Sequence, residues 1–125
     1  MNNLAGVQTS IYAALSGAPA TYPVFDAVPQ LTVKPYIVIG EYTVQPDEEL
    51  ATPTSDAMLN LHTWSTTSGK SQTHEMLDFI RARLDDQTIS GAWLCTEDFN
   101  DILEDPSSTA SARIYHGIAR YRVRV

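Results

Sequence analysis

Hydrophobic residues recur at helical spacing in two segments of the chain. The first segment, from Asn3 to Ser16, stops before Gly17 and Pro19, and the second runs from about Ser68 to Asp85. Residues three or four apart share one face of a helix, so each segment is expected to bury one side. Two helices are therefore predicted, with apolar stripes of Leu4, Val7, Ile11 and Leu15 in the first, and Met76, Leu77, Ile80 and Leu84 in the second.

Four further segments have the composition or the alternation of β-strands. Residues 36–44 are rich in β-branched and aromatic side chains, whereas residues 56–65 and 112–125 alternate between apolar and mixed positions. A fourth strand is expected from Ala92 to about Ile102, and a short extended piece at 22–25. Strands thus come in consecutive pairs, without βαβ alternation. This order predicts an α+β fold, a mostly antiparallel four- to five-stranded sheet packed against two helices.

The length and composition are those of one globular domain, expected to span residues 1–125. Hydrophobic residues make up 43% and charged residues 18% of the chain. Apolar runs such as Tyr36 to Ile39 are far shorter than the roughly 20 residues of a membrane-spanning helix. The N-terminus lacks the basic residues and apolar core of a signal peptide. The single Cys95 excludes an internal disulfide. A soluble, cytoplasmic product without a membrane partner is expected.

Charge is distributed unevenly along the chain. The formal net charge of -7 argues against a chain-wide affinity for nucleic acid. Residues 85–105 contain seven acids and no Lys or Arg, whereas residues 113–125 contain four arginines and no acid. Two interpretations remain open. Neighbouring strands of opposite charge can pair within one sheet, or one of the two charged faces can meet a charged partner.

A nucleotide-binding motif is incomplete in this sequence. Gly69, Lys70 and Ser71 follow a predicted strand and open a helix, which is the context of a phosphate-binding loop. Such a loop needs a glycine five positions before Gly69, where the backbone approaches the phosphate, and this sequence has Trp64 there. A small nucleotide-handling enzyme therefore remains only a remote alternative. Trp64 is instead expected to pack in the core, with an interface position as the alternative.

Other catalytic patterns are also incomplete. His74 and Glu75 resemble the start of a zinc-protease helix, but Asp78 stands where the second histidine is needed. No Gly-x-Ser-x-Gly nucleophile motif is present. His62 and His116 lie at strand positions and are expected to be structural histidines. We therefore predict no catalytic residue, no metal site and no cofactor.

Several segments together resemble a known family. They are Val24-Phe25-Asp26 with Val28-Pro29, the run from Pro35 to Glu41, Leu61-His62-Thr63-Trp64-Ser65 with Gly69 and the following helix, and His116-Gly117 with the alternating Arg120 and Arg122. Their order and spacing over residues 4–125 are similar to those of the tail-completion, or tail-terminator, family of long-tailed phages, prophages and gene-transfer particles.

The resemblance implies a structural protein in a virion tail. It implies a ring, usually of six subunits, that sits on the head-proximal end of the tail tube, stops tube growth and offers a surface to the neck. The implied partners are other copies of the chain, the tail tube protein and a neck or head-completion protein. DNA would pass through the lumen without sequence-specific contacts, and assembly would take place in the host cytoplasm. A head–tail connector or a tube subunit is the alternative role in the same machine.

A closed ring needs two different complementary surfaces on each subunit. The arginines of the last strand are expected to face a neighbour or the lumen, or else to pair with acids of their own sheet. The loop 45–55 is expected to reach the tube or a neighbouring subunit, or else to be merely mobile. The candidate interface residues are Arg120, Arg122, Arg124, Asp47, Glu48, Glu49, Glu97, Asp98 and Asp101.

Overall fold

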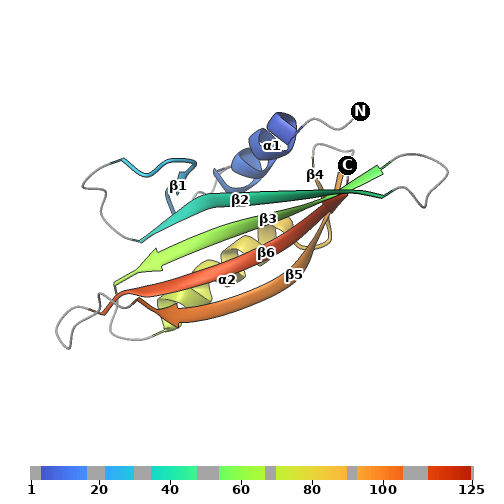
Figure 1. Ribbon diagram of the computed structural model, residues 1–125. Coiled ribbons are helices and arrows are strands. Elements are labelled where there is room, and N and C mark those ends of the chain that lie inside the picture. The colour runs from blue at the N-terminus through green and yellow to red at the C-terminus, as the bar shows by residue number, and fades with distance from the viewer. Residues whose placement is uncertain are drawn as a thin grey trace.

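The computed structural model describes residues 4–16, 22–29, 35–47, 54–66, 70–89, 93–105 and 113–124 (Figure 1). The two predicted helices are present, as α1 (Leu4–Ser16) and α2 (Ser71–Leu84). Each follows the apolar stripe that predicted it, and Ile11, Leu15, Met76 and Ile80 are fully buried. No helix in the described part of the chain is long and apolar enough to cross a lipid bilayer.

Six strands make up the sheet within the described residues, in the order β1-β2-β3-β6-β5-β4. β1 runs parallel to β2, and every other strand pair is antiparallel. The predicted α+β class with a mostly antiparallel sheet is confirmed. The three-residue β4 was not predicted, because so short a segment shows no alternation. The strand bounds are β1 (Val24–Phe25), β2 (Tyr36–Asp47), β3 (Thr54–Ser65), β4 (Gln87–Ile89), β5 (Trp93–Glu104) and β6 (Tyr115–Arg124).

One face of the sheet forms the core together with both helices. The alternation along β3 buries Ala57, Leu59 and Leu61, and the alternation along β6 buries Ala119, Tyr121 and Val123. These side chains join those of α1 and α2 in a single hydrophobic cluster. α2 contacts β3, β5 and β6, and α1 lies beside it (Figure 1). Burial of this apolar surface is the main stabilising contribution to the fold.

Gly117 allows α2 to approach the centre of the sheet. A Cβ atom at Gly117 would lie 2.3 Å from Thr63 Oγ1 and 2.9 Å from Thr73 Cγ2. Thr73, in the first turn of α2, shares a buried hydrogen bond of 2.9 Å with the hydroxyl of Ser65. The start of α2 is therefore held on β3 by a polar contact, directly beside a position where only a bare backbone fits.

Candidate functional site: the open face of the sheet

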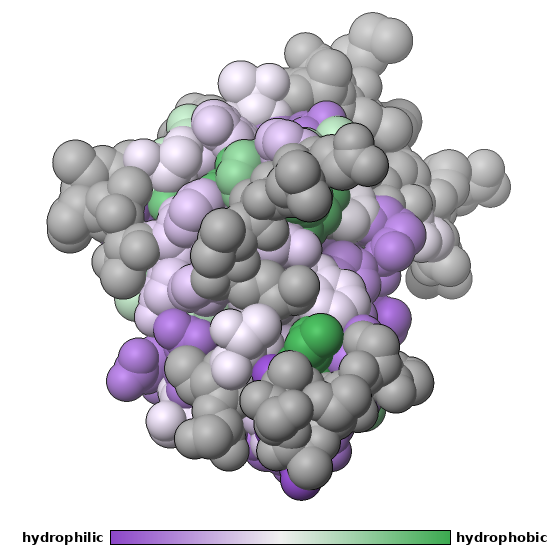
Figure 2. All heavy atoms as spheres, turned by 90° about the vertical axis from the view of Figure 1, so that its left-hand side faces the viewer, coloured by the Kyte–Doolittle hydropathy of each residue, from purple (hydrophilic) through white to green (hydrophobic). Residues whose placement is uncertain are grey.

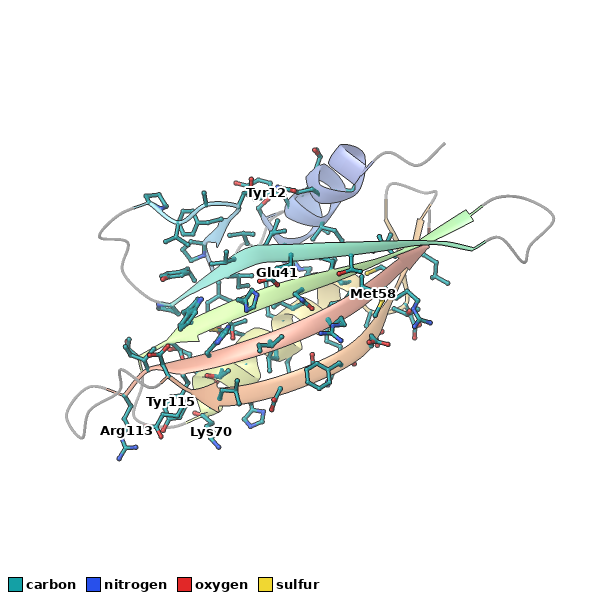
Figure 3. All side chains as sticks on the ribbon, in the orientation of Figure 1. Tyr12, Glu41, Met58, Lys70, Arg113 and Tyr115 are labelled. Atoms are coloured by element: carbon teal, nitrogen blue, oxygen red, sulfur yellow. The ribbon has the colours of Figure 1, made fainter. Side chains whose placement is uncertain are left out.

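The face of the sheet opposite the helices has no helix over it within the described residues, and we call it the open face. It carries the side chains that alternate with the core positions of β3 and β6. On β3 these are Met58, Asn60, His62 and Trp64, and on β6 they are His116, Ile118, Arg120 and Arg122. Figure 3 labels Glu41 and Met58 on β2 and β3 for orientation. Trp64 is half-buried on this face and is not part of the core cluster, so its predicted core position was wrong.

A row of histidines and a glutamate connects three strands across the open face. Nδ1 of His62 on β3 lies 2.6 Å from Nε2 of His116 on β6. Nε2 of His62 lies 3.2 Å from Oε2 of Glu41 on β2. The indole of Trp64 stacks on the other side of His116, with ring centroids 4.1 Å apart and planes 6° apart. The expectation of structural histidines agrees with this hydrogen-bonded, half-buried arrangement.

The ionisation of this row follows from its contacts. The pKa of Glu41 is lowered to about 2, chiefly by its own backbone amide and then by hydrogen bonds from Asn60 and His62. The pKa of His116 is lowered, first by burial and then by the neighbouring His62. At neutral pH, therefore, Glu41 is a carboxylate and His116 is a neutral imidazole. The row carries a fixed negative charge at its exposed end.

Arg120 is held by side chains of its own chain. Its Nε donates a hydrogen bond of 3.0 Å to Oδ1 of Asn60, and Nδ2 of Asn60 donates one of 3.0 Å to Oε2 of Glu41. The guanidinium carbon lies 5.5 Å from the ring centroid of Phe99 on β5, a cation–π contact. The partners of this arginine are therefore an amide and an aromatic ring, and not the acid of the same sheet that was one of the two alternatives from the sequence.

The other predicted acid–arginine pairs are only partly formed. Arg122 Nη2 and Asp98 Oδ1 are 3.8 Å apart, and half of the arginine side chain is exposed, so this pair is weak. Glu97 pairs instead with Arg81 of α2, at 2.9 Å from Nη2 and 3.1 Å from Nε. Same-sheet pairing therefore holds for Asp98 and Arg122, while Glu97 connects the sheet to a helix.

The acidic stretch also contributes to the edge of the sheet. β4 pairs only with residues 93–95 of β5, so within the described residues the rest of β5 has no strand on that side. Oδ1 of Asp85 accepts a hydrogen bond of 2.8 Å from the backbone N–H of Glu97, and Oδ1 of Asp101 accepts one of 2.8 Å from the N–H of Ile102. Carboxylates along an edge strand disfavour unwanted pairing with other chains. In this structure, the Asp101 side chain contacts the backbone of its own strand.

Two further candidates lie at one end of the sheet. Asp47 ends β2 opposite Thr54, and Arg124 ends β6 opposite Asp56 of the same β3. Because both strands pair with the start of β3, the backbone brings the end of β2, which carries Asp47, and the end of β6, which carries Arg124, to the same end of the sheet. The side chains of Asp47 and Arg124, and the whole of Glu48 and Glu49, lie outside the described residues.

The chemistry of the remaining reactive groups is also defined. Burial raises the pKa of the Cys95 thiol to about 12. Lys70, His74 and Asp78 line a hollow of about 430 Å³ between α2 and β5. Within the described residues, no three His, Cys, Asp or Glu side chains are grouped to hold a metal ion.

At one end of the molecule the described atoms are mainly polar, with separate apolar side chains between them (Figure 2).

Comparison with known proteins assigns the family. Residues 9–125 match the family described as Tail completion protein gp17. No curated protein matches the sequence significantly. A chain of the solved structure "Virion of native gene transfer agent (GTA) particle" is similar in fold, with a TM-score of 0.75 and 17% identity over 100% of both chains. Since the family match covers nearly the whole sequence, the protein belongs to the tail completion protein gp17 family and has a structural role in the assembly of a phage-type virion tail.

Proposed function

We propose that the protein forms a ring of six subunits that caps the head-proximal end of the tail tube. The ring stops tube polymerisation and presents the joining surface for the head. Each subunit is one domain comprising residues 1–125. The observation that carries this proposal is the match of residues 9–125 to a tail-completion family. A protein that completes a tail must bind the finished tube and must also prevent further addition.

The open face supports an assembly role over a catalytic one. Its polar side chains bind one another across β2, β3 and β6, and Glu41, His62 and Asn60 form a continuous chain of hydrogen bonds. Such a network stiffens the sheet and defines the positions of its surface groups. We therefore assign the protein no enzymatic activity and no cofactor.

The proposed partners are a second copy of the chain, the tail tube protein and a neck or head-completion protein. DNA passes through the lumen without sequence-specific contacts. The net charge of -7 and the intramolecular bonds of Arg120 support the absence of base recognition. The protein is located at the head-proximal end of the tail and is assembled in the host cytoplasm.

Deletion of the gene from the parent phage or prophage tests this function directly. Electron microscopy of the resulting particles should show overlong tubes and separate filled heads, and a plasmid copy of the gene should restore normal particles. Tails of normal length lying free beside heads would instead support a connector that joins without setting the tube end. Intact particles would overturn the proposal. Purified protein that polymerises into long tubes would indicate a tube subunit.

A further inference from the structure

The contact between His62 and His116 directs two ring nitrogens at one point on the open face. Nδ1 of His62 and Nε2 of His116 are 2.6 Å apart, while the ring centroids are 4.8 Å apart and the planes differ by 30°. The nitrogens are too close for rings packed face to face, so the rings meet edge to edge and the lone pairs in their planes converge. Neutral imidazole nitrogens arranged in this way are ligands for divalent transition metals.

A carboxylate lies behind the first of these rings. Oε2 of Glu41 is 3.2 Å from Nε2 of His62, and the lowered pKa of Glu41, about 2, keeps it ionised at neutral pH. A carboxylate only accepts hydrogen bonds, so Nε2 of His62 carries a hydrogen and Nδ1 of the neutral ring is a bare acceptor. Histidines that bind metal ions usually donate their other N–H to a carboxylate. His62 therefore already has the tautomer and the orientation of a ligand.

The strands around the two rings are shaped to hold them. The register between β2 and β3 shifts over residues 39–42, and bulges of this kind re-aim side chains. A Cβ atom at Gly40, within the shift, would lie 2.6 Å from Cδ2 and 2.7 Å from Nε2 of His62, so only glycine leaves room for this ring. The indole of Trp64 stacks on His116 and holds the second ring. Both rings are thus positioned by their neighbours.

We propose that His62 and His116 bind a divalent transition-metal ion of the Ni²⁺ or Zn²⁺ type, which joins β3 to β6. His62 supplies Nδ1 and His116 supplies Nε2, while the hydrogen of His116 moves from Nε2 to Nδ1 of the same ring. Two nitrogens bound to one tetrahedral ion are about 3.3 Å apart, so the present 2.6 Å must widen by only about 0.7 Å. Within the described residues no group of three His, Cys, Asp or Glu ligands is present, so water completes the coordination. The ion cross-links two strands and takes part in no reaction.

Access and charge favour this site over the other metal-binding groups of the chain. The side chain of His62 is 19% exposed and that of Glu41 is 68% exposed, so an ion can enter from the open face and meets a negative charge there. The thiol of Cys95 is fully buried and protonated and does not compete. His74, the third histidine of the sequence, is exposed on α2 and provides a matched control. The inference concerns the single subunit and does not depend on the proposed ring.

Calorimetric titration of purified, metal-free and untagged protein with Ni²⁺ tests the site. We expect one bound ion per chain, bound at least tenfold more weakly by His62→Gln and by His116→Gln, and equally well by His74→Gln. Glu41→Gln keeps an acceptor for His62 but removes the charge, and it should weaken binding about tenfold. Absence of saturable binding by the wild type would overturn the proposal. Binding that survives either His62→Gln or His116→Gln unchanged would overturn it as well.

Tryptophan fluorescence gives a second test that does not require the histidine variants to fold. In Trp93→Phe, Trp64 is the only tryptophan of the chain, and its ring centroid lies 4.1 Å from that of His116. Paramagnetic Ni²⁺ quenches an adjacent indole, whereas Zn²⁺ has a closed shell and does not. Ni²⁺ should therefore quench the emission with the midpoint found by calorimetry, excess Zn²⁺ should restore it, and both effects should weaken between pH 7.5 and 5.5 because protons compete for the ring nitrogens. Emission that Ni²⁺ leaves unchanged would overturn the proposed site.

Discussion

His62 and His116 lie diagonally across the β3–β6 strand pair, with Nδ1 of His62 2.6 Å from Nε2 of His116. Only one hydrogen fits between two nitrogens at this distance, so one ring donates and the other accepts. A second proton on the accepting nitrogen would turn that ring into a cation, leave two N–H groups facing each other and break the hydrogen bond.

We expect this pair to make stability depend on pH. The pKa of His116 is lowered, so below about pH 6.5 the unfolded chain binds a proton that the folded protein does not. The free energy of unfolding should thus be highest at pH 7.5 and decrease as the pH falls through 6.5 to 5.5. His62, Glu41 and Asp105 are the titratable groups that act on His116, and the two acids oppose the effect.

Urea unfolding at several pH values measures this dependence. His116→Gln should flatten the profile between pH 7.5 and 5.5. His74→Gln, on the exposed side of α2, should leave it unchanged. A wild-type profile that is flat or rises toward pH 5.5 would contradict the proposed ionisation.

Arg120 and Arg122 should differ in their effect on the stability of the subunit. Arg120→Ala removes a hydrogen bond to Asn60 and the contact with Phe99, and we expect a loss of about 1–2 kcal/mol in the free energy of unfolding. Arg122→Ala removes only an exposed pair and should cost at most about 0.5 kcal/mol. Urea unfolding of the two variants side by side tests the difference, and equal losses would contradict it.

Gly117→Ala should destabilise the packing of α2 on the sheet. The added Cβ atom would lie 2.3 Å from Thr63 Oγ1, which forces the neighbouring atoms apart, and we expect a loss of about 1–3 kcal/mol. Adding Thr63→Ala removes the contacting hydroxyl and should recover part of that loss. Thermal unfolding of the single and double variants measures both effects. If the double variant loses more stability than the two single variants lose together, this explanation is excluded.

The Cys95 thiol should be inert in the folded protein. It is fully buried and its pKa is raised to about 12, so almost no thiolate is present at pH 8. An aromatic disulfide reagent should therefore react with it at least 100-fold more slowly than in denaturant. Rapid reaction under native conditions would show that β5 opens readily.

Much of the fold was predictable because alternation and helical spacing are local properties of the chain. The alternation along 56–65 and 112–125 correctly predicted the strands β3 and β6, and the two apolar stripes correctly predicted the helices. β4 and the pairing order of the strands were not predictable. Both depend on contacts between segments far apart in the sequence.

The candidate site was less predictable, since strand register decides which side chains meet. The sequence left a neighbouring subunit, the lumen or an acid of the same sheet open as the partner of Arg120, whereas the register places Asn60 and Phe99 beside it. His62 and His116 were both placed on strands, but they are 54 residues apart, and no local pattern signals their contact. The only indication of this contact in the sequence was that both histidines lie on the mixed faces of their strands.

The sequence by itself determined the α+β class, the alternation of the central strands, the segregation of charge and the resemblance to a tail-completion family. The tertiary structure decided where the charges point. The ladder shifts its register between Glu97 and Phe99, so that Glu97 contacts Arg81 of α2 while Phe99 lies under Arg120 on the open face. Simple alternation would place these two residues on the same face. A bulge reverses that assignment, and its position depends on the pairing of two strands, which a single strand's sequence does not encode.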